Sequence, residues 1–557
     1  MTVMQAPAIG IDLGTTNSAI AIWREGKAQL IANAHGEELT PSIVCIGEDN
    51  TLLVGQAAAT RLLTDPANTA SHFKRFLGSE RRYRLGKEHY TPTELCALVL
   101  GSLKTDAEAW LGQSVREVVI SVPAYFGDQQ RKQVRLAAEL AGLDAVRLIN
   151  EPTAAAMAYS LHEQHSRRFL VFDLGGGTFD VTLVEYQDGI MEVRASAGDN
   201  RLGGEDFTQD LVDAVLGRLG ADRGDLPLSQ LGQVYLACER AKRHRSGNGL
   251  AIELGGTWSQ AVSFSESELA EIWRDTLTRL RKPLSQALSD ARLRPDEVDE
   301  LIFVGGASRQ SEVQQTAVRL LGRFGRYELD PDRVVAMGAA IQAACRLRDS
   351  AVEELIMTDV CPFTLGIAVS QGDQHGIFSP ILERNTVVPA SRVERYRSGH
   401  EQQSSVCISI YQGERFWVRD NLHVDDLEIP LPTGKGIQEV DVRFSYDING
   451  MLEVDVTLVN SGEQFQKVID RSPAGVTEEG KRESRERLAR LKHHPRDALP
   501  NLTLSERLEQ LYEESTGDER RQIEQWLLQF ERVLAGQDPQ QIRSFREEMN
   551  ALLKQWH

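Results

Sequence analysis

Apolar runs alternate with amphipathic stretches over roughly the first 350 residues. Val118–Val122 is an apolar run that leads into Pro123, and residues 128–141 then follow helical spacing. Leu301–Val304 is a second short apolar run, and Gly305 and Gly306 follow it. Strand-like and helix-like segments in this order are typical of an α/β architecture.

The pattern changes after Asp349. Apolar and polar residues alternate with a period of two in Val406–Ile410, Val440–Phe444 and Leu452–Val456, and turn signals such as Asn449-Gly450 separate the runs. Such alternation is typical of an antiparallel sheet with one buried face. We therefore expect a small β-domain, most simply a sandwich.

Helical periodicity returns beyond Thr477. Two apolar stripes predict two helices that pack on each other, through Ile523, Trp526, Leu527, Phe530, Val533 and Leu534 in one and Ile542, Phe545, Met549, Leu552 and Trp556 in the other. The predicted parts are an α/β unit at 1–349, a linker at 350–360, a β-sandwich at 361–475 and a helical unit at 476–557.

Two segments of the α/β unit repeat one pattern. Ile9–Thr16 and Leu170–Thr178 are both apolar strands that end in Asp-Leu-Gly, followed by small residues and a second strand. The tips of two such hairpins can hold a polyphosphate with backbone N–H groups, while Asp12 and Asp173 hold a divalent cation. One Gly-rich turn can simply close a hairpin, but its duplication favours a nucleotide site between two similar lobes.

Composition narrows the possible functions. The 557 residues carry 62 basic and 81 acidic side chains, a formal charge of −19, which argues against a general nucleic-acid binder. The six cysteines have no Cys-x-x-Cys or His/Cys metal spacing and indicate a reducing compartment. Neither a secretory signal at Met1–Pro7 nor an apolar run of roughly 20 residues is evident. We expect a cytoplasmic protein that contacts neither membrane nor nucleic acid.

Three further motifs follow in a fixed order: Val122–Phe126, Asn150–Ala156 and Val304–Arg309. With the two hairpins they resemble the DnaK-type, seventy-kilodalton heat-shock chaperones. The resemblance covers nearly the whole length and weakens in roughly the last 80 residues. The resemblance implies an α/β actin-like (ribonuclease H-like) two-lobed ATPase at 1–349, an interdomain linker, a peptide-binding β-sandwich and a short α-helical lid. It also implies ATP/ADP, Mg²⁺ and K⁺ as cofactors.

The implied function is an ATP-dependent chaperone that is monomeric and assists the folding of client polypeptides. Its implied partners are unfolded polypeptides and a J-domain cochaperone, while dependence on a nucleotide exchange factor stays open. The linker at 352–359 is more polar than is usual in this family, and the residues expected to arch over a bound peptide, Ser370 and Gly399, are small. These departures look most like the short, divergent bacterial HscC type.

The resemblance also assigns roles to individual residues. Lys74 corresponds to a lysine beside the γ-phosphate, Thr178 and Asp180 line the water side, and Asp12, Asp173 and Glu151 hold Mg²⁺ through water. The phosphate-binding residues are Gly14, Thr15, Thr16, Asn17, Gly175, Gly176 and Gly177. The nucleoside-binding residues are Glu239, Lys242, Arg243, Ser246, Gly305, Gly306, Ala307, Arg309 and Asp332. No Gly-Lys pair is followed by Ser or Thr, so a P-loop ATPase is disfavoured.

Coupling, cochaperone and peptide sites are implied in the same way. Pro123, Arg131 and Asp359 match residues that relay the nucleotide state to the linker. Arg147, Asn150 and Thr153, with Asp359, match the positions that meet J-domain proteins. Ile367, Val369, Val406 and Ile408 match the apolar lining of the peptide groove. Each of these four can equally be ordinary sandwich core.

Two other functions remain open on an actin-like fold. A metabolite kinase needs neither a β-domain nor a helical tail, and no sugar-binding constellation is evident. A filament-forming protein would sediment with ATP, whereas a chaperone would stay small.

Overall fold

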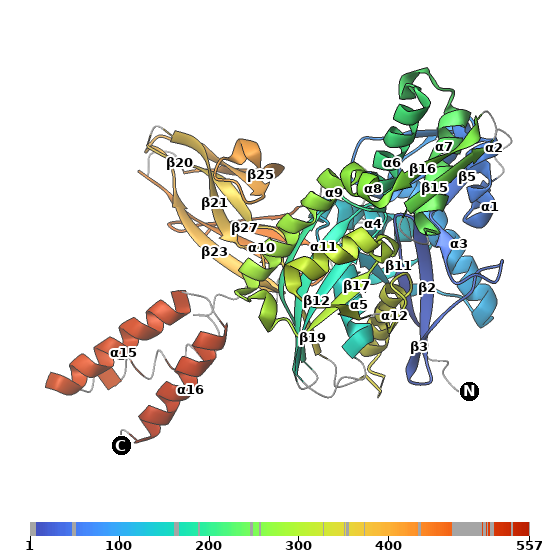
Figure 1. The fold of residues 1–557 in the computed structure, drawn as a ribbon. Coiled ribbons are helices and arrows are strands. Elements are labelled where there is room, and N and C mark those ends of the chain that lie inside the picture. The colour runs from blue at the N-terminus through green and yellow to red at the C-terminus, as the bar shows by residue number, and fades with distance from the viewer. Residues whose placement is uncertain are drawn as a thin grey trace.

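The computed structural model describes residues 7–46, 52–160, 166–187, 190–245, 249–255, 258–326, 328–349, 351–352, 356–372, 374–432, 436–469, 504, 508, 511–512, 517–535 and 539–555. An α/β unit, a β-sandwich and a pair of helices follow one another along the chain (Figure 1). Residues 350, 353–355 and 470–503 lie outside the described residues, so the exact limits at 349, 360 and 475 stay predictions.

The first sheet of the α/β unit is built around the N-terminal hairpin. Its strand order is β11-β10-β1-β2-β3, with β4 paired to β2, and the hairpin is antiparallel while β10 and β11 are parallel to β1. The bounds are β1 Ala8–Asp12, β2 Asn17–Arg24, β3 Lys27–Leu30, β4 Thr40–Pro41, β10 Glu117–Val122 and β11 Asp144–Asn150. Helices α3 (Pro92–Leu111) and α4 (Asp128–Leu140) pack together beside it.

The second sheet repeats this arrangement. Its order is β18-β17-β12-β13-β14-β19-β22, in which β12 and β13 form an antiparallel hairpin and β17 is parallel to β12. The bounds are β12 Arg167–Leu174, β13 Phe179–Gln187, β14 Ile190–Asp199, β17 Glu300–Val304, β18 Gly325–Arg326, β19 Ile356–Val360 and β22 Val387–Val388. The sequence repeat is therefore also a structural repeat, a hairpin with a parallel strand on its outer side.

Two helices join the sheets. Helix α12 (Val334–Arg346) packs on the first sheet and α5 (Glu151–Ser160) on the second, and they contact each other. A Cβ at Gly338 would overlap the carbonyl of Ala154, and one at Gly10 would overlap the backbone of Ala340. The small residues of α12 thus allow a close backbone approach, which fixes the two lobes against each other.

The remaining elements of the α/β unit lie around these layers. In the first lobe they are β5 Ile43–Ile46, β6 Leu52–Val54, α1 Gln56–Ala59, α2 Arg61–Thr64, β7 Thr69–Ser71, η2 Phe73–Phe76, β8 Tyr83–Leu85 and β9 Glu88–Tyr90. In the second lobe they are α6 Gly204–Leu219, α7 Leu228–Arg243, β15 Gly249–Gly255, β16 Trp258–Ser265, α8 Glu266–Ile272, α9 Arg274–Arg279, α10 Arg281–Ala291 and α11 Ser311–Leu321.

The β-sandwich has two four-stranded sheets, β21-β20-β24-β25 and β23-β26-β27-β28. Their bounds are β20 Leu365–Gln371, β21 Gln374–Leu382, β23 Ala390–Arg397, β24 Ser405–Gln412, β25 Leu422–Pro430, β26 Glu439–Tyr446, β27 Leu452–Leu458 and β28 Gln464–Val468. Ile410, Val442 and Phe444 are among the fully buried residues between them. The predicted period-two strands are confirmed.

The sandwich is docked on the α/β unit. Arg384 makes two hydrogen bonds to Asp290, at 2.9 and 2.7 Å, and the amide nitrogen of Ser196 donates to Asn385 at 3.1 Å. The predicted linker contributes β19, which pairs with β14 of the α/β unit and with β22 of the sandwich. One sheet therefore runs from the second lobe into the β-domain.

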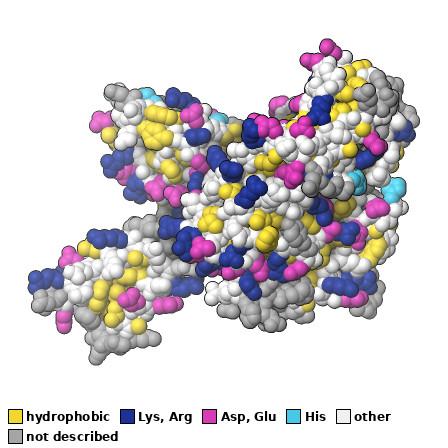
Figure 2. All heavy atoms as spheres, viewed as in Figure 1, with side chains coloured by type: hydrophobic (Ala, Val, Ile, Leu, Met, Phe, Trp, Pro, Cys, Tyr) yellow, Lys and Arg dark blue, Asp and Glu magenta, His cyan; other side chains and the backbone are white. Residues whose placement is uncertain are grey.

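The two predicted C-terminal helices are α15 (Gly517–Ala535) and α16 (Pro539–Gln555). Phe530 and Leu534 of α15 share a small core with Ile542, Phe545 and Met549 of α16, which confirms that the two helices pack on each other. The end of the second stripe was predicted wrongly: Leu552 is exposed and Leu553 is buried in its place, because the helix turns its neighbour toward the core. Trp556 lies outside the described residues. Figure 2 shows apolar side chains gathered on this pair and on the sandwich, with acidic and basic side chains interspersed over the same face of the molecule. Within the described ranges, every helix falls short of the length and apolarity that a bilayer crossing requires.

Candidate nucleotide site

A cavity of about 570 Å³ opens between the two lobes, where the tips of the two hairpins face each other. Of the residues predicted to bind nucleotide, the structure places these on its wall: Asp12, Gly14, Thr15, Thr16, Asn17, Lys74, Glu151, Asp173, Gly175, Gly176, Thr178, Glu239, Lys242, Arg243, Gly305, Gly306, Ala307, Arg309 and Asp332. Gly177 and Asp180 lie just behind the wall, and Ser246 falls outside the described residues. Two sequence segments 161 residues apart, from Asp12 to Asp173, thus form one site, as the repeat predicted.

The hairpin tips touch across the cleft. A Cβ at Gly176 would overlap the Oγ1 atom of Thr16, and a Cβ at Gly203 would overlap the backbone of Gly177. Gly305 has φ +77°, a left-handed conformation that favours glycine. Only residues without side chains let the backbone of both tips approach a ligand and each other this closely.

A buried lysine lies among the acidic residues. Lys74, on η2, donates to Glu151 Oε1 at 2.7 Å, and both side chains are buried. Burial alone would lower the pKa of Lys74, but Glu151 and Asp12 outweigh it and hold that pKa above its ordinary value. Lys74 is therefore a fixed positive charge at the floor of the cleft.

Burial raises the pKa values of three carboxyl groups around Lys74. Burial, and then the charge of Glu151, raise the pKa of Asp12 to about 7, although Asp12 accepts a 2.7 Å hydrogen bond from Ser121. Burial and Glu151 likewise raise the pKa of Asp180 to about 7. The same two causes raise the pKa of Asp173 well above its usual range. Four carboxyl groups thus share one lysine.

The donor set suits magnesium. Asp173 Oδ2 is buried and has no hydrogen-bond partner among the described residues. Hard Mg²⁺ binds carboxylate oxygens and keeps several of its waters, and its charge would relieve the excess of buried acids. In the part of the chain that the structure describes, no three His, Cys, Asp or Glu side chains have the spacing of a direct metal site. That Asp12, Asp173 and Glu151 hold the ion through water stays a prediction, as does K⁺.

Charged side chains from both faces lie on the nucleoside side of the cleft. Glu239 pairs with Lys242 and Arg243, each at 2.7 Å, and these cations hold the pKa of Glu239 at about 2 although burial opposes them. On the facing side, Arg309 at the end of the short helix η5 (Gly306–Arg309) pairs with Asp332 at 3.1 Å. The half-exposed guanidinium groups of Arg243 and Arg309 can lie flat against a purine.

A chain of hydrogen bonds leads from the cleft to the linker strand. Asp180 accepts from the amide of Tyr125, two residues beyond Pro123, at 3.1 Å. Arg131 then donates to the carbonyls of Phe126 and Ala124 at 3.0 and 3.3 Å. These contacts tie the loop after β10 both to the second hairpin and to α4.

The chain continues through Asn150. Arg131 donates to Asn150 Oδ1 at 2.6 Å, and Asn150 Nδ2 donates to Asp359 Oδ2 at 2.8 Å in β19. Asn150, predicted for partner binding, thus joins the predicted coupling residues. Thr153 is buried and Arg147 is half-buried near Asp359. Their predicted contact with a J-domain stays a prediction.

The predicted peptide residues lie in the sandwich. Ile367 and Ile408 are buried in its core, and Val369 and Val406 are half-buried against it. This placement fits core packing as well as a groove, so their role stays a prediction. The side chain of Ser370 lies 2.7 Å from the Nδ1 atom of His375.

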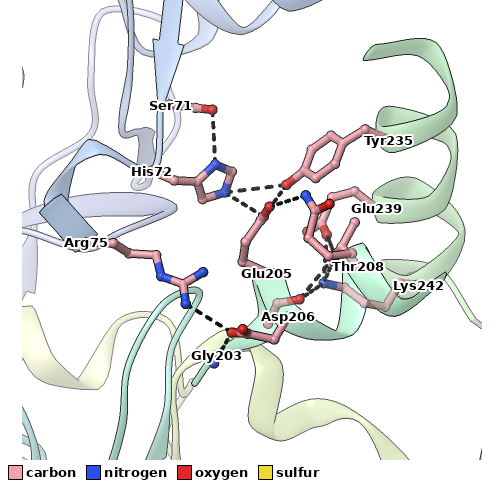
Figure 3. Close-up of polar contacts among 12 residues, drawn as sticks. Ser71, His72, Arg75, Gly203, Glu205, Asp206, Thr208, Tyr235, Glu239 and Lys242 are labelled. Atoms are coloured by element: carbon pink, nitrogen blue, oxygen red, sulfur yellow. Dashed lines mark hydrogen bonds and ion pairs between the residues drawn. The ribbon is translucent and has the colours of Figure 1, made fainter. Parts of the chain in front are cut away.

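Sequence reasoning missed two bridges between the lobes (Figure 3). His72 Nε2 lies 3.2 Å from Glu205 Oε2, and Arg75 Nη2 lies 3.2 Å from Asp206 Oδ2. The hydroxyl of Tyr235 also donates to Glu205. The run Gly203-Gly204-Glu205-Asp206, two glycines before two acids at the start of α6, is the signal that could have directed attention to this position.

A family model described as Hsp70 protein matches residues 8–86 and 81–555 of this chain, nearly its whole length. Hsp70 proteins combine an actin-like ATPase with a β-sandwich and a helical lid, and they are ATP-dependent chaperones that bind unfolded polypeptides and J-domain cochaperones. The order of α/β unit, sandwich and helices agrees with this match. The resemblance inferred from the motifs is confirmed at this level: the chain belongs to the Hsp70 family.

Proposed function

We propose that this protein hydrolyses Mg²⁺-bound ATP in the interlobe cleft and uses that cycle to bind and release extended apolar peptides in its β-sandwich. The observation that carries the proposal is the convergence of two glycine-tipped hairpins on one cavity that also holds Lys74 and four buried carboxyl groups. Family membership supports the same activity.

Hydrolysis adds water to the γ-phosphorus and breaks its bond to the bridging oxygen, which leaves with ADP. Positioning and charge neutralisation dominate such a reaction. Lys74 neutralises negative charge on the transferred group, and Thr178 orients the attacking water from the cavity wall. Bound Mg²⁺ would shield the phosphate oxygens, and Asp12, Asp173 and Glu151 would hold it through water.

The hydrogen-bond chain from Asp180 to Asp359 supports a proposal for coupling. Asp180 belongs to the nucleotide side, whereas Asp359 belongs to the strand shared by both units. A change in the cleft therefore reaches the linker through Tyr125, Arg131 and Asn150. A J-domain protein that contacts Arg147, Asn150, Thr153 and Asp359 would act on the same chain of contacts.

The small residues expected to arch over the peptide, Ser370 and Gly399, support loose peptide binding, and with the polar linker they favour an HscC-like specialist. Ile367, Val369, Val406 and Ile408 would line that groove. We include in the proposal a monomeric, cytoplasmic protein of bacterial origin. The metabolite kinase and the filament are not favoured, because the family match extends over the sandwich and the helices.

Steady-state ATP turnover of the full chain, with and without an unfolded peptide and a J-domain protein, tests the proposal. We expect stimulation by each, whereas transfer of phosphate to a small-molecule acceptor would point to a kinase. Thr178→Ala should retain ATP but lose most turnover. Its matched control is Thr278→Ala, because that hydroxyl donates only to the Arg274 carbonyl of its own helix.

A separate variant tests the coupling between the nucleotide cleft and the linker strand. Arg131→Ala removes the donor that joins Phe126, Ala124 and Asn150, so peptide should no longer stimulate turnover in this variant. Undiminished stimulation would contradict the coupling route while leaving the ATPase proposal intact.

A further inference from the structure

A second cavity of about 880 Å³ lies between the α/β unit and the sandwich. Phe363, Leu422 and Val424 of the β-domain form one side of it, and η2 and the start of α6 form part of the other. Nothing in the nucleotide site as described above uses this space.

At two places, residues that are neighbours in sequence line different cavities. Lys74 lines the nucleotide cavity, and its neighbour Arg75 lines the second cavity. Glu205 lines the nucleotide cavity, and its neighbour Asp206 lines the second cavity. In Figure 3, Glu205 points toward His72 while Asp206 points toward Arg75. Successive side chains thus face opposite cavities in both elements.

Arg75 and Asp206 close the wall between the two cavities with contacts that can open. Arg75 Nη2 lies 3.2 Å from Asp206 Oδ2 and donates to the Arg201 carbonyl at 3.0 Å. Both side chains are partly exposed, at 16% and 22%. A Cβ at Gly177 would lie 2.6 Å from Arg75 Cγ, so the stem of Arg75 packs against the phosphate-side hairpin tip.

The second cavity favours an anion. Arg75, Arg201 and Arg279 line it, although the chain as a whole carries −19. The acids that face it are paired with cations. Arg75 and Arg279 are themselves engaged by Asp206 and Asp199, which leaves Arg201 as the lining guanidinium without an ion pair among the described residues. Asp206 contacts Arg75 and Arg279, and Asp128 pairs with Lys132 at 2.6 Å. Asp199, beside the rim, pairs with Arg279 at 2.8 Å. Clustered guanidinium groups attract and hold phosphate.

We propose that the second cavity is the exit site for the phosphate ion produced by hydrolysis, and that the Arg75–Asp206 pair is its gate. The phosphate leaves through the wall beside Lys74 and is received by Arg75, Arg201 and Arg279. ADP can then remain in the nucleotide cavity while phosphate departs on the far side. This inference rests on the proposed ATPase function.

The test follows two products in a single turnover of Mg²⁺·ATP by the full chain. Acid quench reports ADP formation, and a fluorescent phosphate sensor reports phosphate release. A second mixing experiment starts from protein loaded with Mg²⁺·ADP and inorganic phosphate, which measures phosphate dissociation independently of hydrolysis. ADP formation itself tests the proposed function.

Asp206→Asn breaks the ion pair, while its amide oxygen can still accept from Gly203 N, as Asp206 does at 2.8 Å. We expect phosphate to dissociate about two- to fivefold faster, the size expected for one partly exposed pair, with ADP formation unchanged. The matched control is Glu268→Gln, another carboxylate that caps its own helix and pairs with an arginine, but away from both cavities.

Leu422→Trp tests the proposal by narrowing the exit instead of opening it. Leu422 is 58% exposed and lines the second cavity, so a larger side chain there fills the exit without touching the wall. We expect slower phosphate dissociation, and no change from the control Leu528→Trp on α15, where Leu528 is similarly exposed at 54%. Opposite shifts in the two variants support the exit. If phosphate dissociates from both variants at the wild-type rate, the exit proposal is overturned. If the wild-type protein forms no ADP, the ATPase proposal is overturned instead.

Discussion

The two hairpins of the cleft share a motif and a topology but differ in electrostatics. In the first, Asp12 faces Ala19 across the hairpin and Ser121 on the parallel neighbour, and Ser121 donates a hydrogen bond to it. In the second, Asp173 takes the equivalent place, but its neighbours in register are Asp180 and Val304.

The two aspartates therefore have different surroundings. Asp173 faces a second acid and an apolar side chain, and its Oδ2 atom has no hydrogen-bond partner among the described residues. Burial and the charge of Glu151 raise its pKa well above the usual range. The repeat therefore determines where the two aspartates lie. The residues paired with them in register determine which hydrogen bonds and charges surround each carboxyl group. The first hairpin has a hydrogen-bond donor for Asp12 in Ser121, whereas the apolar Val304 takes that place beside Asp173.

Lys74 is the positive charge that both hairpins share, so its removal should have the largest effect. In Lys74→Met we expect turnover to fall about 10²- to 10³-fold, because the charge on the transferred phosphoryl group is no longer neutralised. The control is Lys104→Met, which removes a half-buried lysine that donates to the Gly142 carbonyl on the far side of the first lobe. Near-normal turnover in Lys74→Met would contradict the assigned role.

Closure of the cleft depends on particular glycines of the second tip. In Gly176→Ala the new Cβ overlaps Thr16 of the opposite tip, and overpacking of this kind typically costs about 1–3 kcal/mol. We expect ATP affinity to fall by one to two orders of magnitude, roughly the equivalent of that cost. Gly175→Ala is the matched control, because its Cβ would meet only Thr178, at 3.8 Å. Equal affinities in the two variants would show that the tips need not touch.

Two substitutions compare the hairpins directly. In Asp173→Asn, a buried acid with an unpartnered oxygen is replaced by a neutral amide, so we expect nucleotide-free protein at pH 8 to gain about 1–2 kcal/mol in unfolding free energy. Asp12→Asn should gain less, because Asp12 already accepts from Ser121. Denaturant titration of both variants measures the difference, and a larger gain in Asp12→Asn would reverse the comparison.

Much of the site could be predicted because its chemistry lies in local sequence. Asp12 and Asp173 each end an apolar strand before a small-residue turn, so both strand and tip are readable from a few residues. Period-two alternation likewise identified the sandwich, and helical stripes identified α15 and α16. Lys74 was placed by resemblance alone, since an isolated lysine carries no signal of burial.

What could not be predicted depends on register between distant segments. Ser121 opposite Asp12 and Val304 opposite Asp173 follow from strand pairing, which periodicity does not specify. The bridge from Arg75 to Asp206 joins residues 131 positions apart, and a charged pair of this kind leaves no pattern in either segment. The same holds for Asn150, whose place between Arg131 and Asp359 needs the docked linker strand.

Acidification should have the smallest effect of the changes considered, and it again compares the carboxyl groups of the two hairpins. Asp12 in the first hairpin and Asp180 in the second have pKa values of about 7, far above the unfolded value near 3.8, so the folded protein takes up protons at both as pH falls through 7. Without nucleotide, these groups make the protein more stable at pH 6 than at pH 8. Burial lowers the pKa of His72, which acts in the opposite sense below its ordinary value of 6.5.

Magnesium must compete with the proton on Asp12, so its contribution to ADP binding should fall as the pH falls. For one carboxyl group with a pKa of about 7, the loss between pH 7.5 and pH 6.0 is about eightfold. Calorimetric titration with Mg²⁺·ADP at both pH values measures it, with ADP in chelator as the control for protonation of the nucleotide. Asp12→Asn should remove part of the dependence. An identical pH dependence with and without magnesium would contradict the placement of the ion beside Asp12.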